Sequence, residues 1–198
     1  MKKKVYLLLP LLLVFVSCRS TQDIVDKDRV MFGMIYDYDN SPVNMVTVLV
    51  DGTPIVQSDI QGRFVLPVKD AEQHTIELKK DGYEVVTLKT VYDPVRVLYF
   101  KMFTATQLLN KAETMLERKE YNEAKGYLER GLSIAPYRTD ISYLLAVIDY
   151  KTGKYESAES KLEAIIKEGT NDSAVKGFLD CIRKKATENN NETESPKS

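Results

Sequence analysis

The spacing of hydrophobic positions changes once along the chain, near Thr104. Before this residue, short β-branched and aromatic runs are separated by turn residues such as Asp51 and Gly52, a pattern typical of strands joined by tight turns. After it, apolar residues recur with the period of amphipathic helices. The pattern therefore predicts a β region followed by a helical region, an α+β chain of two domains.

The β region covers residues 29–102 and contains seven predicted strands. In the fifth, Ile76 and Leu78 alternate with Glu77 and Lys79, as expected for an antiparallel sheet with one buried face. We therefore expect a seven-stranded antiparallel β-sandwich. The predicted strands are residues 30–36, 45–50, 55–58, 63–68, 74–80, 84–91 and 95–102.

The helical region covers residues 104–185 and carries an internal repeat of 34 residues. The recurring positions are Tyr121, Ala124, Leu128 and Glu129, which return as Tyr155, Ala158, Leu162 and Glu163. We expect five helices, the fifth of which closes the apolar face that a terminal repeat leaves open. They are predicted at residues 105–118, 122–134, 138–151, 156–167 and 173–185. The polar residues 186–198 are expected to form a disordered tail.

The first residues have the pattern of a targeting segment. Lys2, Lys3 and Lys4 precede an apolar run over residues 5–16, which is shorter than a relaxed membrane-spanning helix and has the length of a signal-peptide core. The run ends at Ser17 and Cys18. Residues 1–17 are therefore predicted to be a signal peptide, and residues 18–28 a polar tether.

This junction resembles the lipobox of bacterial lipoproteins, in which a small residue precedes the cysteine that becomes the acylated N-terminus. The resemblance implies lipidation of Cys18 and a lipid bilayer as a partner, because several acyl chains anchor a protein stably. An Asp directly after the lipidated cysteine resembles an inner-membrane retention signal. This chain has Arg19 at that position, which favours the outer membrane of a bacterial cell envelope. An ordinary secretory signal with an incidental cysteine is the alternative.

The β region resembles the carboxypeptidase regulatory-like, transthyretin-type domains and, more distantly, the PEGA modules. The resemblance rests on Gly33 and on the turn with Ser58, Asp59, Gly62 and Phe64. It implies a capping Asp, a left-handed Gly and an aromatic residue that enters the core. It concerns only the accessory domain of carboxypeptidases, whose zinc-binding catalytic domain has no counterpart here.

The helical region resembles the tetratricopeptide repeat, with small residues such as Ala112 and Ala124 where paired helices cross, and with Pro136 at the end of the first repeat. It departs from the family at Lys111, where an apolar residue is usual, and at Thr170 in place of a second proline. The resemblance implies a protein-binding groove lined by the first helix of each repeat. The residues mapped to that groove are Leu109, Glu113, Leu116, Tyr143, Val147 and Tyr150. The apolar and aromatic set points to an extended segment or helix as ligand, but Tyr143 and Tyr150 are equally expected to pack against the fifth helix or the β region.

Charge and residue content exclude several function classes. The 198 residues carry a net charge of −1, and mild acidity without clustered Lys and Arg argues against nucleic acid as a partner. His74 is the single histidine and Cys181 the single cysteine besides Cys18, so we expect no metal site, no cofactor and no enzymatic activity. His74 is expected to be a partly buried strand residue, and Cys181 a buried or half-buried small hydrophobe. A calcium site at Asp37, Asp39 and Asp59 is the disfavoured alternative to a role in turns.

These observations predict a membrane-anchored, non-catalytic interaction or assembly scaffold. A carbohydrate or cell-wall-binding lipoprotein that uses the β-sandwich is the alternative, and an accessory subunit of an outer-membrane assembly machine is a third, weaker one. Sugar sites favour exposed aromatic platforms; the β region has no Trp, and its tyrosines are Tyr36, Tyr38, Tyr83, Tyr92 and Tyr99.

Overall fold

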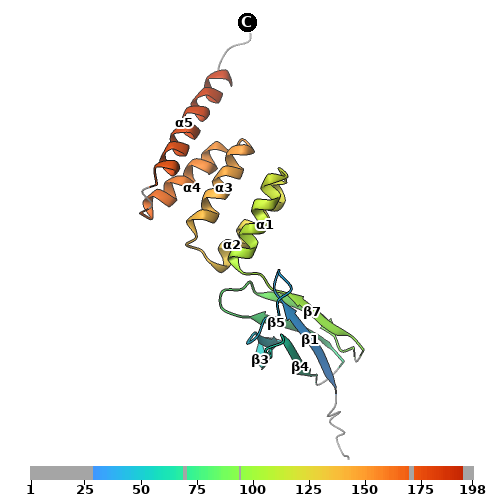
Figure 1. The fold of residues 1–198 in the computed structure, drawn as a ribbon. Helices are drawn as coiled ribbons and strands as arrows, with labels where there is room; N and C mark the ends of the chain where they lie inside the picture. Colours follow the sequence, from blue (N-terminus) through green and yellow to red (C-terminus); the bar gives the residue numbers. More distant parts are fainter. Residues whose placement is uncertain (1–28, 69–70, 94, 170–171, 194–198) are drawn as a thin grey trace, which may run out of the picture.

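The computed structural model describes residues 29–68, 71–93, 95–169 and 172–193, with side chains to residue 188. A β-sandwich and an array of five helices follow one another along the chain and meet end to end (Figure 1). The predicted two-domain α+β fold is thus confirmed. The predicted signal peptide, the tether and Cys18 lie outside the described residues.

The sandwich has seven strands in two sheets, as predicted, and each strand end falls within two residues of its predicted position. One sheet has the order β4-β1-β7 and the other the order β3-β2-β5-β6. The strands are β1 (Val30–Tyr36), β2 (Thr47–Val50), β3 (Thr53–Gln57), β4 (Arg63–Pro67), β5 (Gln73–Lys79), β6 (Val86–Val91) and β7 (Val97–Lys101).

The expectation of a purely antiparallel sandwich is wrong at one pair, because β1 and β7 run parallel, with Phe32 opposite Val97 and Tyr36 opposite Lys101. The cause is the connection that follows β6. It passes from one sheet to the other at the end of the sandwich where β1 begins, so that β7 starts beside the start of β1. All other strand pairs in the two sheets are antiparallel.

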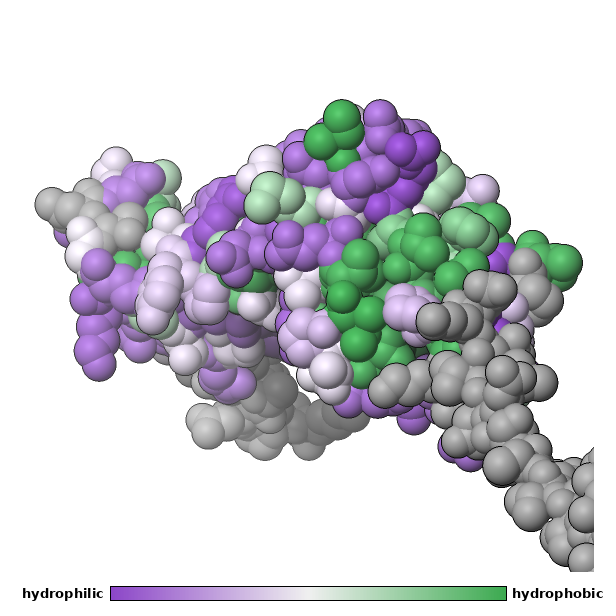
Figure 2. Space-filling view, turned by 90° about the horizontal axis from the view of Figure 1, so that it is seen from below, coloured by the Kyte–Doolittle hydropathy of each residue, from purple (hydrophilic) through white to green (hydrophobic). Residues whose placement is uncertain are grey.

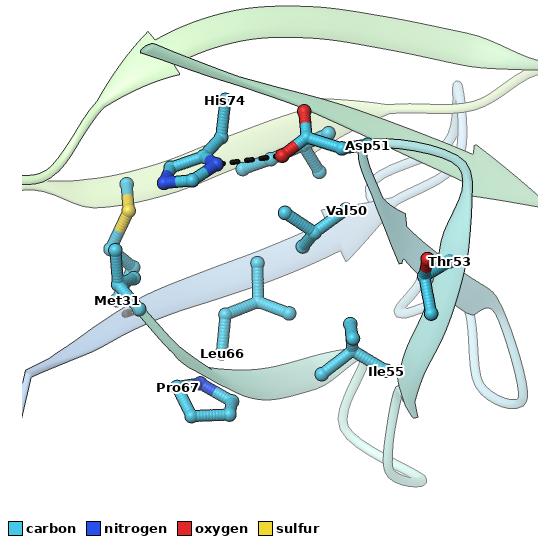
Figure 3. Close-up of a pocket in the computed structure, with 10 residues that line it drawn as sticks. Met31, Val50, Asp51, Thr53, Ile55, Leu66, Pro67 and His74 are labelled. Carbon is cyan, nitrogen blue, oxygen red and sulfur yellow. Dashed lines mark hydrogen bonds and ion pairs between the residues drawn. The ribbon is translucent and has the colours of Figure 1, made fainter. Parts of the chain in front are cut away.

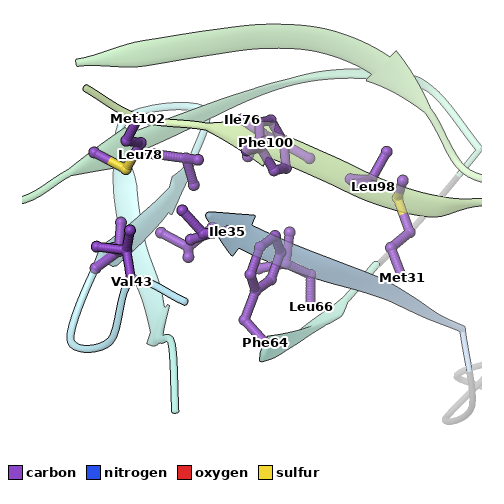
Figure 4. Packing of buried hydrophobic residues seen from close by; sticks show 12 residues of the cluster. Met31, Ile35, Val43, Phe64, Leu66, Ile76, Leu78, Leu98, Phe100 and Met102 are labelled. Carbon is purple, nitrogen blue, oxygen red and sulfur yellow. The ribbon is translucent and has the colours of Figure 1, made fainter. Parts of the chain in front are cut away.

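Alternate residues of both sheets fill the space between them (Figure 4). Ile76 and Leu78 are fully buried, which confirms the alternation read from β5. Gly33 lies opposite Phe64 in the register of β1 and β4, and a Cβ atom on Gly33 would lie only 2.0 Å from Cζ of that ring. Glycine at position 33 therefore leaves the space in which Phe64 enters the core.

The turn before β4 has the features that the sequence predicts. Asp59 Oδ1 accepts hydrogen bonds from the backbone N–H groups of Gln61 and Arg63, both at 2.9 Å. Gly62 adopts a positive φ of 73°, and its position is crowded by the carbonyl oxygen of Ile35. Asp59 and Gly62 are therefore turn-forming residues.

The five helices are α1 (Ala105–Glu117), α2 (Tyr121–Ile134), α3 (Thr139–Lys151), α4 (Tyr155–Lys167) and α5 (Ser173–Thr193). Successive helices pack against one another as antiparallel neighbours. The four repeat alanines, at positions 112, 124, 146 and 158, are fully buried where paired helices approach closely, as predicted.

Helix α5 continues to Thr193, beyond its predicted end at Lys185. The extra turns have local support, because Thr187 donates a hydrogen bond to the carbonyl oxygen of Arg183 at 2.6 Å and Lys185 pairs with Glu188. The expectation of a disordered tail from residue 186 is therefore wrong as far as Thr193. Residues 194–198 lie outside the described part of the chain.

Each domain has its own hydrophobic core, and the two domains meet through polar and aromatic contacts. The Arg130 guanidinium donates two hydrogen bonds of 2.8 Å and one of 3.0 Å to the carboxylate of Glu84, and it also lies over the ring of Phe103. Lys111 lies over the ring of Tyr38, with Nζ 5.4 Å from the centroid. This contact explains why a cation stands where a tetratricopeptide repeat usually has an apolar residue.

Candidate protein-binding groove

A groove of about 460 Å³ runs between α1, α3 and the start of α5. Its apolar lining includes Leu109 from α1, Tyr143 from α3 and Val175 from α5, while the buried Ile165 of α4 closes it from below. The helices that line it are the first helices of successive hairpins. The groove thus lies on the face that the repeat register indicates.

The structure brings together three of the six residues that the sequence mapped to this groove. Leu109, Glu113 and Tyr143 line it. Leu116, Val147 and Tyr150 are partly buried and are not among its lining residues. The three missing residues follow further along α1 and α3, whereas the groove opens at the first turns of α3 and α5.

The two tyrosines contact the fifth helix. The ring of Phe178 on α5 has its centroid 5.8 Å from that of Tyr143 and 5.4 Å from that of Tyr150, both with edge-on geometry. Tyr150 therefore packs against the protein's own last helix, which was the alternative to a role in binding. Tyr143 packs against this helix and also lines the groove.

The residues that line the groove from α5 and from the start of α3 were missed by the sequence reading. Val175 and Ala174 belong to the helix that was interpreted only as a cap, and Thr139 and Asp140 belong to the first turn of α3. The capping helix takes the position that the first helix of a third repeat would have. The sequence signal for these residues is therefore the place of α5 in the repeat order. It places α5 beside α3 in the same way that α3 lies beside α1.

Carboxylates give the rim of the groove an acidic character. Glu113 is exposed there, and Asp140 and Asp172 stand at the starts of α3 and α5. The Arg138 guanidinium hydrogen-bonds Asp140 and holds the pKa of that carboxyl below its usual value. Asp172 Oδ1 accepts a hydrogen bond from the backbone N–H of Ala174. The groove therefore combines apolar walls with negative charge at its edge.

A buried polar cluster fixes α3 against α4. Asp149 is 2% exposed, and its Oδ2 accepts hydrogen bonds from Lys161 Nζ at 2.6 Å and from Ser157 Oγ at 2.7 Å. Burial acts to raise the pKa of Asp149, but the bonds from Lys161 and Ser157 outweigh it, so that the pKa lies below its usual value. This cluster holds the second hairpin in shape.

The residues considered for catalysis or metal binding make hydrogen bonds within strands and turns. His74 Nδ1 lies 2.7 Å from Asp51 Oδ2, and the imidazole is partly buried, as expected for a strand residue with a polar partner. Asp37 Oδ1 accepts hydrogen bonds from the backbone N–H groups of Asp39 and Ser41, which is a role in a turn. Among the described residues, no group of His, Cys, Asp and Glu side chains has an arrangement that could hold a metal ion.

Cys181 is exposed on α5, so the expectation that it is a buried or half-buried hydrophobe is wrong. The physical reason is that α5 packs on one side only, through the buried Val175, Leu179 and Ile182.

The tyrosines of the sandwich do not form one exposed platform. Tyr38 stacks with Phe103 at the junction of the domains, and Arg29 lies over Tyr92. Tyr99 is the one that projects well into solvent from the sandwich.

Comparison with known families agrees with the architecture of the helical region. Residues 115–180 match the family model of the tetratricopeptide repeat. The matched segment begins near the end of α1 and extends into α5, and thus includes both helical hairpins in large part. Over these residues the helical region is therefore similar to tetratricopeptide repeats. No curated protein matches the chain. Within the described residues, none of the helices is both long and apolar enough to cross a membrane.

Proposed function

We propose that this protein is a non-catalytic scaffold of the bacterial cell envelope, held to a lipid bilayer through an acylated Cys18, more specifically to the outer membrane. Its helical domain captures a protein partner in the groove between α1, α3 and α5. The observation that carries the proposal is this groove, which is apolar, open and built on the binding face of a recognised repeat.

The arrangement of the domains supports a scaffold. Strand β1 begins at the end of the sandwich opposite the helices (Figure 1). A chain anchored before this point holds the groove at the far end of the molecule. The sandwich then acts as a spacer. We propose that it is related to the carboxypeptidase regulatory-like or PEGA-like domains, on the basis of its Asp59 turn and of the packing of Phe64 against Gly33.

The anchor is tested with Cys18→Ala. Several acyl chains contribute roughly 0.8 kcal/mol per buried methylene, so that their loss removes stable anchoring. We expect the variant to accumulate as an unprocessed precursor or in the soluble fraction, as shown by membrane fractionation and intact mass. A variant that stays in the membrane at the processed mass would disprove lipidation.

The groove is tested with Glu113→Arg in a crosslinking pull-down from native membranes. A cation at the exposed rim reverses the local charge and places a long side chain beside Leu109 and Tyr143, and we expect partner recovery to fall at least five-fold. Glu129→Arg is the matched control, because Glu129 is exposed on α2, outside the groove. Equal recovery with both variants would place the partner elsewhere.

A further inference from the structure

The end of the sandwich at which the chain enters is open and apolar. A hollow of about 320 Å³ lies there between the two sheets, lined by apolar residues such as Val50, Ile55, Leu66 and Ile76 and by the hydrogen-bonded pair of Asp51 and His74 (Figure 3). Figure 2 views the molecule from this side and shows a continuous hydrophobic area. Leu66 and Ile76 are themselves buried core residues, so the hollow lies directly against the core of the sandwich.

Exposed apolar side chains extend this area beyond the hollow. Val95, in the connection between β6 and β7, is 89% exposed, and Val91 at the end of β6 is 52% exposed. Both lie at the same end, because Val91 is paired with Gln73 at the start of β5 and β7 starts beside β1. An exposed apolar patch marks a contact with another protein, a membrane or a ligand.

Arg29 lies at the rim of the hollow. The carbonyl oxygen of Arg29 accepts a hydrogen bond of 2.8 Å from the backbone N–H of Val68, which itself lines the hollow. From Arg29 back to Cys18 there are eleven peptide steps. They span at most about 40 Å when fully extended. An acylated Cys18 therefore keeps this end of the sandwich within about 40 Å of the bilayer surface.

We propose that this open end of the sandwich is a lipid-contacting face, at which hydrocarbon of the anchoring bilayer covers Ile55 and Val95 and enters the hollow. The proposal rests on the proposed anchor at Cys18. It adds an orientation: the sandwich stands on the membrane by its open end and presents the tetratricopeptide groove away from it.

The test compares an isoleucine in the middle of β3 with an isoleucine in the turn that follows this strand. Ile55, 43% exposed, lines the hollow, whereas Ile60, 76% exposed, lies in the turn that follows β3. Each is replaced by Cys in a Cys181→Ser background and labelled with an environment-sensitive fluorophore. The labelled chains are placed on phosphatidylcholine vesicles that contain lipids with a nitroxide quencher on the acyl chain.

We expect quenching at position 55 to exceed quenching at position 60 at least two-fold, with a blue-shifted emission at position 55. Equal quenching at both positions, or none at position 55, would overturn the proposal. A blue shift at position 55 that rises with protein concentration in the absence of vesicles would assign this end to a second copy of the chain and would also overturn it.

A second arm separates this proposal from that of the anchor. A hexahistidine tag replaces residues 1–18 and attaches the same labelled chains to nickel-chelating lipid in the vesicles. If the native chain does not stay on vesicles but the tagged chain is quenched at position 55, the acyl anchor is refuted and the lipid-contacting face stands. If the tagged chain stays on the vesicles without preferential quenching at position 55, the face is refuted whatever anchors the native chain.

Discussion

At the scale of single residues, the most informative group is the buried carboxylate of Asp149. It is 2% exposed and accepts hydrogen bonds from Lys161 and Ser157 across the gap between α3 and α4. The sequence shows Asp149 only as a polar position in an apolar helix. Its role depends on the packing of α4 and was therefore beyond the reach of pattern analysis.

Asp149→Asn should destabilise the helical domain at neutral pH by about 1 to 3 kcal/mol, because the variant removes the charge that compensates Lys161. The pKa of Asp149 is lowered in the folded protein. The carboxylate therefore stabilises the fold above the ordinary Asp pKa, and this contribution is lost as the pH falls through the lower folded value. Urea unfolding at pH 7 and pH 3 measures both effects. The difference between variant and wild type should shrink at pH 3, and a constant difference would contradict the assignment.

At the scale of elements, helix crossings and strand alternation were predictable, because both follow from local periods in the sequence. The 34-residue repeat and the alternation in β5 indicate directly which of their residues are buried. The parallel pairing of β1 with β7 was not predictable, since it depends on the path of one connection between sheets. Most of the groove lining was also missed, in part because α5 supplies residues such as Val175 through its position in space and not through the repeat register.

The element-scale prediction compares the crossing at Ala158 with the tyrosines of α3. Ala158→Leu should lower the free energy of unfolding by roughly 1 to 3 kcal/mol, because added methylenes have no space in the packed crossing. Tyr143→Ala combined with Tyr150→Ala should also destabilise, by about 1 to 3 kcal/mol, because the edge contacts with Phe178 are lost.

The matched control for the tyrosine pair is Tyr137→Ala. Tyr137 is 88% exposed between α2 and α3, so its replacement should change stability by less than about 0.5 kcal/mol. Urea unfolding followed by circular dichroism gives all three values. If the tyrosine pair variant loses no more stability than Tyr137→Ala, the contacts of these two rings with Phe178 do not stabilise the packing of α5.

At the scale of the whole molecule, the core of the sandwich and the two buried clusters of the helical region belong to separate domains, which a defined junction joins. Glu84 and Arg130, together with the contact between Lys111 and Tyr38, tie the sandwich to the first hairpin. Neither contact follows from a sequence pattern, because each joins residues of different domains. The junction gives the sandwich its proposed role: it fixes the groove at a set distance from the end where the chain enters.

The central claim is that a protein partner occupies the groove between α1, α3 and α5. A photo-crosslinking amino acid at position 113 or at position 129, introduced into the full chain in its native membrane, tests it most directly. Both side chains are exposed, but only position 113 lines the groove. The account predicts a discrete crosslinked protein adduct from position 113 that is absent from position 129. The same adducts from both positions, or an adduct from position 129 alone, would contradict it.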